Sequence, residues 1–325
     1  MSYSLIDIQK RIEQAIQGID LAREPRELYD PIIYTLRAGG KRMRPALTLM
    51  SCNLFSDDIE PALNAALGLE IFHNFTLLHD DIMDRAEIRR GKPTVHLKWD
   101  ENIAILSGDV MQILAFEFIS NCDCSKLPQV LKVFNKTAIE VCEGQQYDMN
   151  FESRNDVTTD EYLNMIRLKT SVLLGACTQI GAILGGAGTE DAEQMYKFGV
   201  DLGISFQLKD DYLDTFGDVE KFGKKIGGDI LAKKKTYLFL KALEKADNKQ
   251  KNQLEEWYTT SASDPDKKIR DVIQIFRSLN VHEELLDLAH QYSKRAMNIL
   301  DGLNIKNSRK RAIKTLSQTL LSREH

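Results

Sequence analysis

The sequence predicts an all-α fold in which one helix follows another along the whole chain. Apolar residues recur at spacings of three and four nearly throughout, as on the buried face of a helix. No run of alternating apolar and polar residues bounded by turn signals supports a strand. No stretch rich in Pro, Gly and Ser divides the chain, so residues 1–325 are expected to form a single domain of about a dozen mostly antiparallel helices.

The apolar periodicity places the individual helices. The N-terminal segment carries a stripe from Leu5 to Ile19, which indicates an amphipathic helix and not a signal peptide. Capping residues mark later boundaries, with Thr158 or Thr159 before one helix and Asp264-Pro265 at the start of another. The remaining helices are expected at residues 26–37, 43–54, 58–83, 101–120, 127–151, 159–187, 190–215, 231–245, 248–259, 266–278, 281–301 and 306–321.

Composition narrows the class of protein. The chain is 43% hydrophobic with a formal net charge of −5, a balance that predicts no general affinity for nucleic acid or an anionic membrane. The most apolar long stretch, residues 172–188, contains polar residues and glycines, so it is expected to pack inside the protein without stable membrane insertion. An odd number of cysteines argues against a disulfide framework, and reduced thiols indicate a cytoplasmic protein. The five are Cys52, Cys122, Cys124, Cys142 and Cys177.

Two irregular segments, residues 85–100 and 216–230, interrupt the helical pattern. Both are rich in Gly and charged residues, and each follows the end of a long predicted helix. Loops of this length inside a compact domain are uncommon and usually functional. The two segments therefore point to the functional part of the chain.

An acidic cluster precedes each of these loops. Aspartates four apart share a helix face, where like charges destabilise the helix by a few tenths of a kcal/mol per pair. The helix dipole disfavours anions at a C-terminal end by about 0.3–1 kcal/mol more. One such cluster could be a solvated surface, but two copies with apolar flanks indicate a site for a hard cation such as Mg²⁺. The clusters are Asp80, Asp81 and Asp84, and Asp210, Asp211 and Asp214.

Basic residues near both clusters suggest a phosphate-bearing substrate, since carboxylate-bound Mg²⁺ often completes its shell with phosphate oxygens. Lys169 is the most informative, because it interrupts an otherwise apolar helix. Runs of lysine are commonly just solvated. His73 lies two turns before Asp80, and a lone histidine on a mostly apolar face is more often a core residue than a ligand. The basic candidates are Lys41, Arg44, Arg89, Arg90, Lys169, Lys224, Lys225 and Lys234.

These motifs, in this order and spacing, resemble those of the trans-isoprenyl diphosphate synthases, the family of farnesyl and geranylgeranyl diphosphate synthases. The matching segments are GGKRMRP at 39–45, LLHDDIMDRAEIRRGKPTVH at 77–96, LKTSVLLGA at 168–176, FQLKDDYLDTFGD at 206–218 and FGKKIGGDILAKKKT at 222–236. The resemblance implies a bundle of helices around a deep central cavity, usually in a homodimer. It also implies that the enzyme condenses isopentenyl diphosphate with an allylic diphosphate.

The resemblance further implies roles for single residues. Three Mg²⁺ ions bridged by the allylic diphosphate would be bound by Asp80, Asp84 and Asp210, with Asp81, Asp211 and Asp214 in support. The same diphosphate would contact Arg89, Lys169, Lys234 and either Lys224 or Lys225, because the family has one lysine where this chain has two. Isopentenyl diphosphate would contact Lys41, Arg44, His73 and Arg90, while Lys169, Thr170 and Gln207 would lie at the reacting carbons.

Product length is expected to depend on the helix that carries the first cluster. Phe75 and Thr76, five and four residues before Asp80, lie one turn (about 5.4 Å) further along that helix, and Phe72 lies about one turn beyond. An aromatic ring there would stop a growing chain. By resemblance, Phe75 with the smaller Thr76 favours the twenty-carbon geranylgeranyl diphosphate, with the fifteen-carbon farnesyl diphosphate as the alternative.

Other functions fit the sequence less well. A terpene cyclase would carry an Asn/Ser/Glu second motif and would lack the Lys41–Arg44 segment and Arg90, and a head-to-head squalene or phytoene synthase differs in the same motifs. An inactive regulatory subunit of a heteromeric prenyl synthase is the non-enzyme alternative. Such a subunit is expected to lose carboxylates from one cluster, whereas all six are present here.

Overall fold

The computed structural model describes residues 3–217, 226–259 and 264–321, with the side chain of residue 321 left out. The described chain divides into two compact units. The first comprises residues 1–135, 176–195 and 303–316, and the second comprises residues 136–175, 196–302 and 317–325. The single domain expected from the sequence stays a prediction, and the two units are treated separately below.

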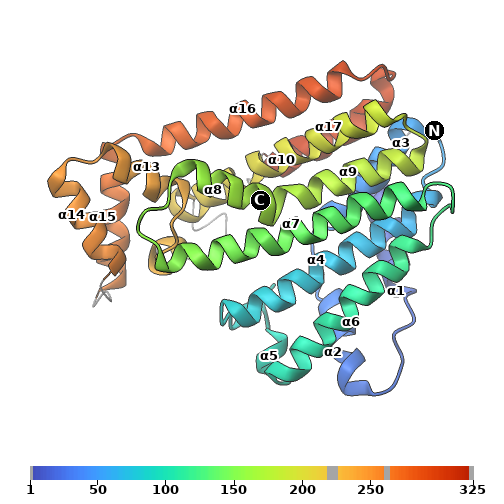
Figure 1. Ribbon diagram of the computed structural model, residues 1–325, viewed down its shortest axis with the longest axis horizontal. Coiled ribbons are helices and arrows are strands. Elements are labelled where there is room, and N and C mark those ends of the chain that lie inside the picture. The colour runs from blue at the N-terminus through green and yellow to red at the C-terminus, as the bar shows by residue number, and fades with distance from the viewer. Residues whose placement is uncertain (1–2, 218–225, 260–263, 322–325) are drawn as a thin grey trace. The chain divides into compact units, whose positions relative to one another are not determined.

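The first unit is built mainly from the N-terminal helices. Two long helices, α4 and α6, run side by side in it (Figure 1). Their backbones approach closely at Gly68, where a Cβ atom would lie 2.6 Å from the side chain of Ile119. The elements are α1 (Leu5–Gln17), α2 (Arg26–Leu36), α3 (Met43–Phe55), η1 (Glu60–Ala62), α4 (Leu63–Met83), β1 (Ile88–Arg89), β2 (Lys92–Pro93), α5 (Val95–Lys98) and α6 (Glu101–Ser120).

Helices from the later part of the chain form most of the second unit. Four of its helices, α13 to α16, pack against one another around a core that includes Leu238, Phe276 and Leu285. The elements from residue 127 onward are α7 (Leu127–Ser153), α8 (Thr159–Ile166), η2 (Arg167–Ser171), α9 (Val172–Gly185), α10 (Thr189–Phe216), α12 (Gly228–Leu231), α13 (Tyr237–Lys245), α14 (Asn248–Thr259), α15 (Pro265–Ser278), α16 (Val281–Gly302) and α17 (Asn307–Leu321).

The all-α prediction is confirmed, and most predicted helix ends fall within two residues of those observed. The caps behave as expected: Thr158 accepts a bond from the Glu161 N–H in a capping box, and Asp264 accepts one from the Lys267 N–H. The predicted helix over 159–187 is wrong in one respect, because a π-helical turn at Arg167–Ser171 interrupts it. The helix expected from 231 begins only at Tyr237.

The first irregular segment contains a small β-hairpin that the sequence did not predict. Ile88 pairs with Pro93 and Arg89 with Lys92 in antiparallel register. The two turn residues between them, Arg90 and Gly91, have φ values of 52° and 72°. Positive φ at both central positions is the geometry of a two-residue type I′ turn, which matches the twist of its strands. The hairpin is too short to show the alternation by which strands are recognised in a sequence.

Two stretches of helix are long and apolar enough to span a membrane by length and composition, namely α6 and Thr159–Gly185. In the second, 78% of the apolar window is buried inside the protein, as in the core helix of a globular domain. In α6 only 39% is buried, so this helix has an exposed apolar side.

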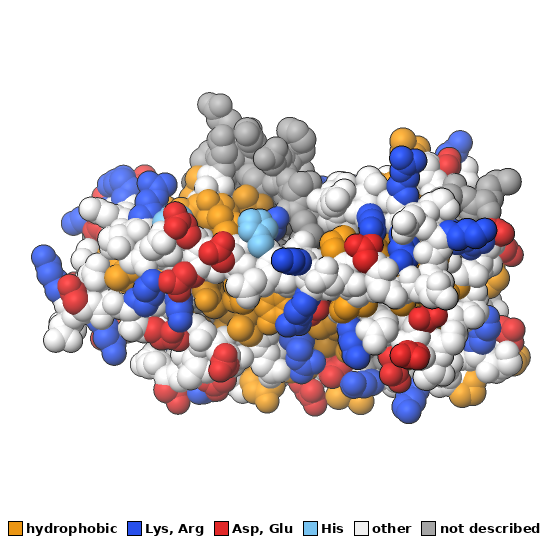
Figure 2. Space-filling view, turned by 90° about the horizontal axis from the view of Figure 1, so that it is seen from above, with side chains coloured by type: hydrophobic (Ala, Val, Ile, Leu, Met, Phe, Trp, Pro, Cys, Tyr) orange, Lys and Arg blue, Asp and Glu red, His pale blue; other side chains and the backbone are white. Residues whose placement is uncertain are grey.

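On the face shown in Figure 2, acidic and basic side chains are intermixed, in keeping with the small net charge.

Candidate active site

The first aspartate cluster lies at the C-terminal end of α4, in the first unit. Asp84 is the C-cap residue, and its N–H donates to the carbonyl of Asp80 at 2.8 Å. Asp81 is only 5% exposed, whereas Asp84 is exposed and Asp80 is half-buried. Asp81 accepts two bonds from Arg89, from Nε at 2.9 Å and from Nη2 at 2.6 Å. Asp81 is therefore held by a guanidinium, which suits the supporting role expected of it.

The two arginines of the β-hairpin, Arg89 and Arg90, bond to different parts of the first unit. Arg89, in the first strand, pairs with Asp81, and Arg90, in the turn, donates through Nη1 to the carbonyl of Gly39 at 2.5 Å. The same nitrogen also contacts Oδ1 of Asn74 at 3.3 Å. The structure thus brings Arg90 to the turn before α3, which carries Lys41, while Arg44 lies at the start of α3 itself.

His73 contacts the other predicted arginine of this group. Its Nε2 lies 2.9 Å from Nη1 of Arg44, and because a guanidinium can only donate, Nε2 must accept. Burial and the nearby positive charges of Arg44 and Arg90 hold the pKa of His73 well below its ordinary value. A neutral ring that accepts at Nε2 carries its proton on Nδ1. His73 therefore orients Arg44, and its remaining donor is the Nδ1–H group.

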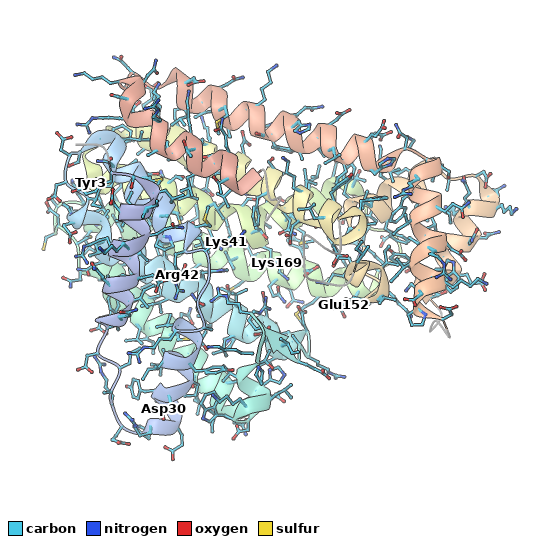
Figure 3. The ribbon with its side chains drawn as sticks, turned by 180° about the vertical axis from the view of Figure 1, so that it is seen from behind. Tyr3, Asp30, Lys41, Arg42, Glu152 and Lys169 are labelled. Carbon is cyan, nitrogen blue, oxygen red and sulfur yellow. The ribbon has the colours of Figure 1, made fainter. Side chains whose placement is uncertain are left out.

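Arg42, Glu70 and Asn74 were missed as site residues in the sequence. Arg42 is 4% exposed and donates to Glu13 and to Glu70, each at 2.8 Å. Figure 3 labels Arg42 and its neighbour in the chain, Lys41. Lys41 is exposed, whereas the side chain of Arg42 is buried in the unit. The available signal was Glu70 itself, a charged residue between Leu69 and Ile71 in an apolar run.

The second unit holds the remaining catalytic candidates, beginning with Lys169, which is labelled in Figure 3. Lys169 and Thr170 lie in the π-helical turn, a feature frequent at functional sites. The Lys169 ammonium donates to Asp148 of α7 at 2.6 Å. Two glycines let neighbouring helices approach this turn. A Cβ on Gly144 would lie 2.2 Å from the nitrogen of Lys169, and one on Gly203 would lie 2.6 Å from Cα of Ser171.

A chain of hydrogen bonds connects Thr170 to the second aspartate cluster on α10. The hydroxyl of Thr170 donates to Oε1 of Gln207 at 3.2 Å, and the amide of Gln207 donates to Asp211 at 3.1 Å. The hydroxyl of Tyr162 donates to the other oxygen of Asp211. Asp211 is 4% exposed and its pKa is raised well above its ordinary value by burial and by the charge of Asp229. Asp211 is therefore buried and hydrogen-bonded, and Tyr162 is a partner that the sequence did not reveal.

Asp229 adds a further carboxylate to the second cluster. Its N–H donates to Oδ2 of Asp214 at 2.8 Å, and its carbonyl accepts from the Lys234 N–H at 2.9 Å. Burial, with the charges of Asp214 and Asp210, raises the pKa of Asp229 to about 6. Asp229 and Asp148 were missed because the GGD segment read as a turn and Asp148 as one polar residue of a helix. The candidates Lys224 and Lys225 lie outside the described residues.

The donor set fits a hard divalent cation. Both clusters offer carboxylate oxygens alone, and the charges of Asp214 and Asp210 add to the effect of burial in raising the pKa of Asp229. Among the described residues, no three side chains of His, Cys, Asp or Glu are grouped closely enough to bind a metal by themselves. Mg²⁺ commonly uses one or two carboxylates together with substrate phosphate oxygens, which is the arrangement that such spacing permits.

Aromatic rings surround the residues predicted to set product length. Phe75 is 8% exposed, and Phe72 beneath it is fully buried, with their ring centroids 5.6 Å apart. Phe72 in turn packs edge-on against Phe134 at 5.2 Å, and Phe134 against Phe116 at 4.9 Å. Thr76 donates its hydroxyl to the carbonyl of His73 at 2.8 Å. The first unit therefore backs Phe75 with further aromatic rings.

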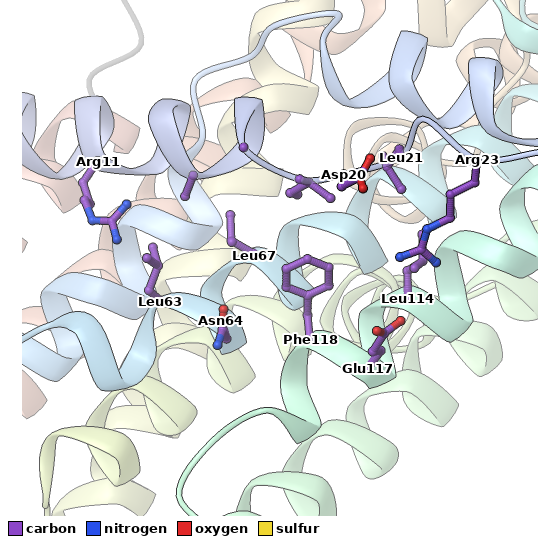
Figure 4. Close-up of a pocket in the computed structure, with 13 residues that line it drawn as sticks. Arg11, Asp20, Leu21, Arg23, Leu63, Asn64, Leu67, Leu114, Glu117 and Phe118 are labelled. Atoms are coloured by element: carbon purple, nitrogen blue, oxygen red, sulfur yellow. The ribbon is translucent and has the colours of Figure 1, made fainter.

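A separate groove of about 380 Å³ lies elsewhere in the first unit, among α1, α4 and α6 (Figure 4). It contains no residue of the aspartate cluster and none of the basic candidates. Arg11 at its edge is already paired with Glu60 at 2.6 Å. The groove is therefore distinct from the candidate active site. Its apolar lining comprises Ala15, Ile19, Leu21, Leu63, Leu67, Leu114 and Phe118.

Comparison with known proteins identifies the family of the chain. Residues 25–276 match a family model described as polyprenyl synthetase. The chain is 38% identical over 317 residues to a short chain isoprenyl diphosphate synthase of Methanothermobacter thermautotrophicus, covering 97% of this chain and 95% of the relative. It is 45% identical over 237 residues to a geranylgeranyl diphosphate synthase of Methanosarcina mazei, covering 72% and 73%. A geranylfarnesyl diphosphate synthase of Natronomonas pharaonis is 38% identical over 250 residues, covering 71% and 73%.

Solved structures give the same result for the fold. A crystal structure of a geranylgeranyl pyrophosphate synthase matches with a TM-score of 0.94 and 45% identity, covering 99% of this chain and 100% of that one. The geranylgeranyl pyrophosphate synthetase of Pyrococcus horikoshii matches with a TM-score of 0.92 and 34% identity, covering 98% and 97%.

The pKa of Asp229 leads to a prediction about stability. A carboxyl whose pKa rises on folding from 3.8 to about 6 binds its proton more tightly in the folded state. Without metal ions, its contribution to the free energy of unfolding is therefore present below pH 4 and lost as pH rises through 6. In the wild-type protein we expect Asp229 to lower the free energy of unfolding by about 1–2 kcal/mol as the pH rises across this range. Asp229→Asn is expected to remove this decrease, measured by urea unfolding in EDTA.

Asp287, an exposed residue of α16, provides the matched control. Asp287→Asn is expected to keep the pH dependence of the wild-type protein. If the free energy of unfolding depends on pH equally in the wild type and in Asp229→Asn, the ionised Asp229 carboxylate is not destabilised in the folded state.

Proposed function

Because the chain belongs to the polyprenyl synthetase family, we propose that it condenses isopentenyl diphosphate with an allylic diphosphate. The starters are dimethylallyl and geranyl diphosphate and, for a twenty-carbon product, farnesyl diphosphate. That product is an (E)-prenyl diphosphate of fifteen to twenty carbons, most simply geranylgeranyl diphosphate. The observation that carries the proposal is the pair of aspartate clusters with buried, hydrogen-bonded second members, Asp81 and Asp211. The names of the relatives support it.

Mg²⁺ is the proposed cofactor. As the family resemblance implies, Asp80, Asp84 and Asp210 would hold it, supported by Asp81, Asp211 and Asp214. When bound, Mg²⁺ supplies positive charge that stabilises the departing diphosphate. The number of three Mg²⁺ ions, bound together with one diphosphate, is what the family resemblance implies. Asp81 and Asp211, held by Arg89 and by Tyr162 with Gln207, would keep the exposed members of each cluster in place.

The basic residues would bind the two diphosphates. We assign isopentenyl diphosphate to the cations that meet near the turn before α3, where His73 orients Arg44 and Asn74 contacts Arg90. Arginine presents planar donors that suit phosphate oxygens, and lysine presents a mobile point charge. The residues proposed to bind isopentenyl diphosphate are Lys41, Arg44, His73 and Arg90. Those proposed to bind the allylic diphosphate are Arg89, Lys169, Lys234 and one of Lys224 or Lys225.

The residues of the π-helical turn would act at the reacting carbons. Ionisation of the allylic C–O bond leaves a carbocation, which survives only where water is excluded. The hydroxyl of Thr170 is already committed to Gln207, and the ammonium of Lys169 to Asp148, so both groups are fixed in position. The double bond of isopentenyl diphosphate then attacks, and the released diphosphate takes the proton by analogy with the family.

We further propose that the protein forms a homodimer and acts in the cytoplasm. On α6, Ile105, Leu106 and Ile113 are 38%, 56% and 66% exposed, although the opposite side of the helix is buried against α4. Exposed apolar side chains gathered on one helix are typical of a surface that another molecule covers. A second copy of the chain is the occupant that the family resemblance implies.

The reaction is tested by incubating the protein with labelled isopentenyl diphosphate and, separately, each allylic starter, with products sized by chromatography. We expect a product of fifteen or twenty carbons that forms with Mg²⁺ and disappears with EDTA, because the carboxylate clusters need a cation to hold the leaving group. No incorporation from any starter by folded protein would contradict the proposal and favour the regulatory subunit.

Product length is tested with Phe75→Ala. Because Phe75 is the first ring that a growing chain would meet, its removal is expected to add at least one five-carbon unit to the product. Phe198→Ala, which truncates a fully buried ring of the second unit, is the matched control and should lower stability without changing product length. An unchanged product from Phe75→Ala would show that the limit lies elsewhere.

The oligomeric state is tested with Ile113→Asp, measured by sedimentation. A charge in a buried apolar interface is costly, so we expect the variant to shift from dimer to monomer. Ile6→Asp replaces a residue that is 76% exposed on α1 and is expected to leave the dimer intact. A wild-type protein that sediments as a monomer, or that associates with lipid vesicles through α6, would contradict the proposed dimer.

A further inference from the structure

We infer that Glu70 and Asn74 of α4 are positioning residues that set the orientation of the Arg90 guanidinium for a diphosphate. The inference rests on the proposed function, because it concerns the isopentenyl diphosphate group assigned above. Neither residue is expected to touch substrate. Both act through Arg90, and the contacts that carry the inference lie entirely within the first unit.

Asn74 is held in one orientation by Glu70. The two residues are four apart on α4, and they are 1% and 3% exposed. The amide nitrogen of Asn74 donates to the Glu70 carbonyl at 2.8 Å and to Oε1 at 3.2 Å. The amide oxygen is thereby turned toward Nη1 of Arg90 at 3.3 Å. The flipped amide would place its oxygen against a carboxylate and its N–H₂ group against a guanidinium, and both contacts are repulsive.

Glu70 is fixed in turn by Arg42. Nη1 of Arg42 donates to the same Oε1 at 2.8 Å, while Nε donates to Glu13 at 2.8 Å and Nη2 to the carbonyl of Leu36 at 2.5 Å. Arg42 adopts a φ of 48°, in the left-handed region that is unfavourable for a residue with a side chain. A backbone held there by several buried bonds is a typical sign of a functional constraint.

Arg90 is confined on its other side by the glycine turn before α3. It donates to the carbonyl of Gly39, and its guanidinium atoms lie 3.2–3.4 Å from the point where a Cβ on Gly40 would stand. Arg90 also has a positive φ, 52°. The guanidinium is therefore held between Asn74 and this turn, so the direction of its remaining donors is set before any anion arrives.

The chemistry of these contacts explains why Asn74 suits the position. The recorded partners of the Arg90 side chain are neutral oxygens, those of Gly39 and Asn74, whereas the charge of Glu70 is matched by Arg42. Arg89, by contrast, is paired with a carboxylate. Arg90 is thus oriented without being neutralised, which leaves its charge for a diphosphate.

The test is Asn74→Leu, which has nearly the same shape and removes the three hydrogen bonds of the Asn74 side chain. We expect the KM for isopentenyl diphosphate to rise about tenfold, with kcat and the KM for the allylic substrate changed less than about twofold. The matched control is Asn53→Leu, another buried asparagine of the first unit, which bonds to the carbonyl of Ser56 and does not contact Arg90. The control should lower stability and leave both KM values unchanged.

A double-mutant cycle separates positioning from a general loss of structure. In an Arg90→Ala background, Asn74→Leu is expected to raise the KM for isopentenyl diphosphate no further, because its effect passes through Arg90. Additive effects of the two substitutions would overturn the inference. If Asn74→Leu does not fold, Asn74→Ser serves in the same cycle, since the short hydroxyl cannot span Glu70 and Arg90.

Binding of inorganic diphosphate in EDTA, measured by calorimetry, decides the inference independently of turnover. Weaker binding by Asn74→Leu, with no further loss in the Arg90→Ala background, supports it even if the wild-type protein forms no prenyl product. Equal affinity for wild type and Asn74→Leu overturns it while leaving the condensation activity to stand on the product assay.

Discussion

The site depends on holding like charges together at the C-terminal ends of two helices. In α4 and α10 three aspartates share one or two turns, where their mutual repulsion and the helix dipole both oppose them. Each unit meets this cost in a different way. In the first, Arg89 neutralises Asp81, and in the second, the hydroxyl of Tyr162 and the amide of Gln207 solvate a buried Asp211. In both, the middle member of the cluster is buried and held by hydrogen bonds from neighbouring side chains.

The arginines of the first unit divide by the charge of their partners. Arg42 and Arg89 are paired with carboxylates, whereas the described hydrogen bonds of the Arg90 side chain are to neutral oxygens. An arginine held by neutral acceptors keeps its charge for a ligand. Because His73 and Asn74 are adjacent on α4, one turn of this helix orients both Arg44 and Arg90. The orientation of these two arginines therefore follows from the packing of a single helix.

Much of this could be predicted from the sequence, because helical periodicity and charged motifs are local signals. The helices and the six aspartates needed no tertiary information, and neither did the basic candidates. The rest depended on contacts between distant residues. The bond between Glu70 and Arg42 joins two helices, Tyr162 reaches Asp211 across 49 positions, and Asp229 matters through Asp214. The β-hairpin was missed for a different reason, since its strands contain only two residues each and its turn requires a positive φ at Arg90.

The π-helical turn at Arg167–Ser171 shows how packing can override local preference to build a site. The segment reads as uninterrupted helix, yet α7 and α10 approach it at Gly144 and Gly203, where even a Cβ atom would collide with the turn. The extra residue in a π turn changes the direction of successive side chains. Lys169 consequently reaches Asp148 on α7 while the next residue, Thr170, reaches Gln207 on α10. The close approach of α7 and α10 at these two glycines therefore lets adjacent residues of the turn bond to two different helices within the second unit.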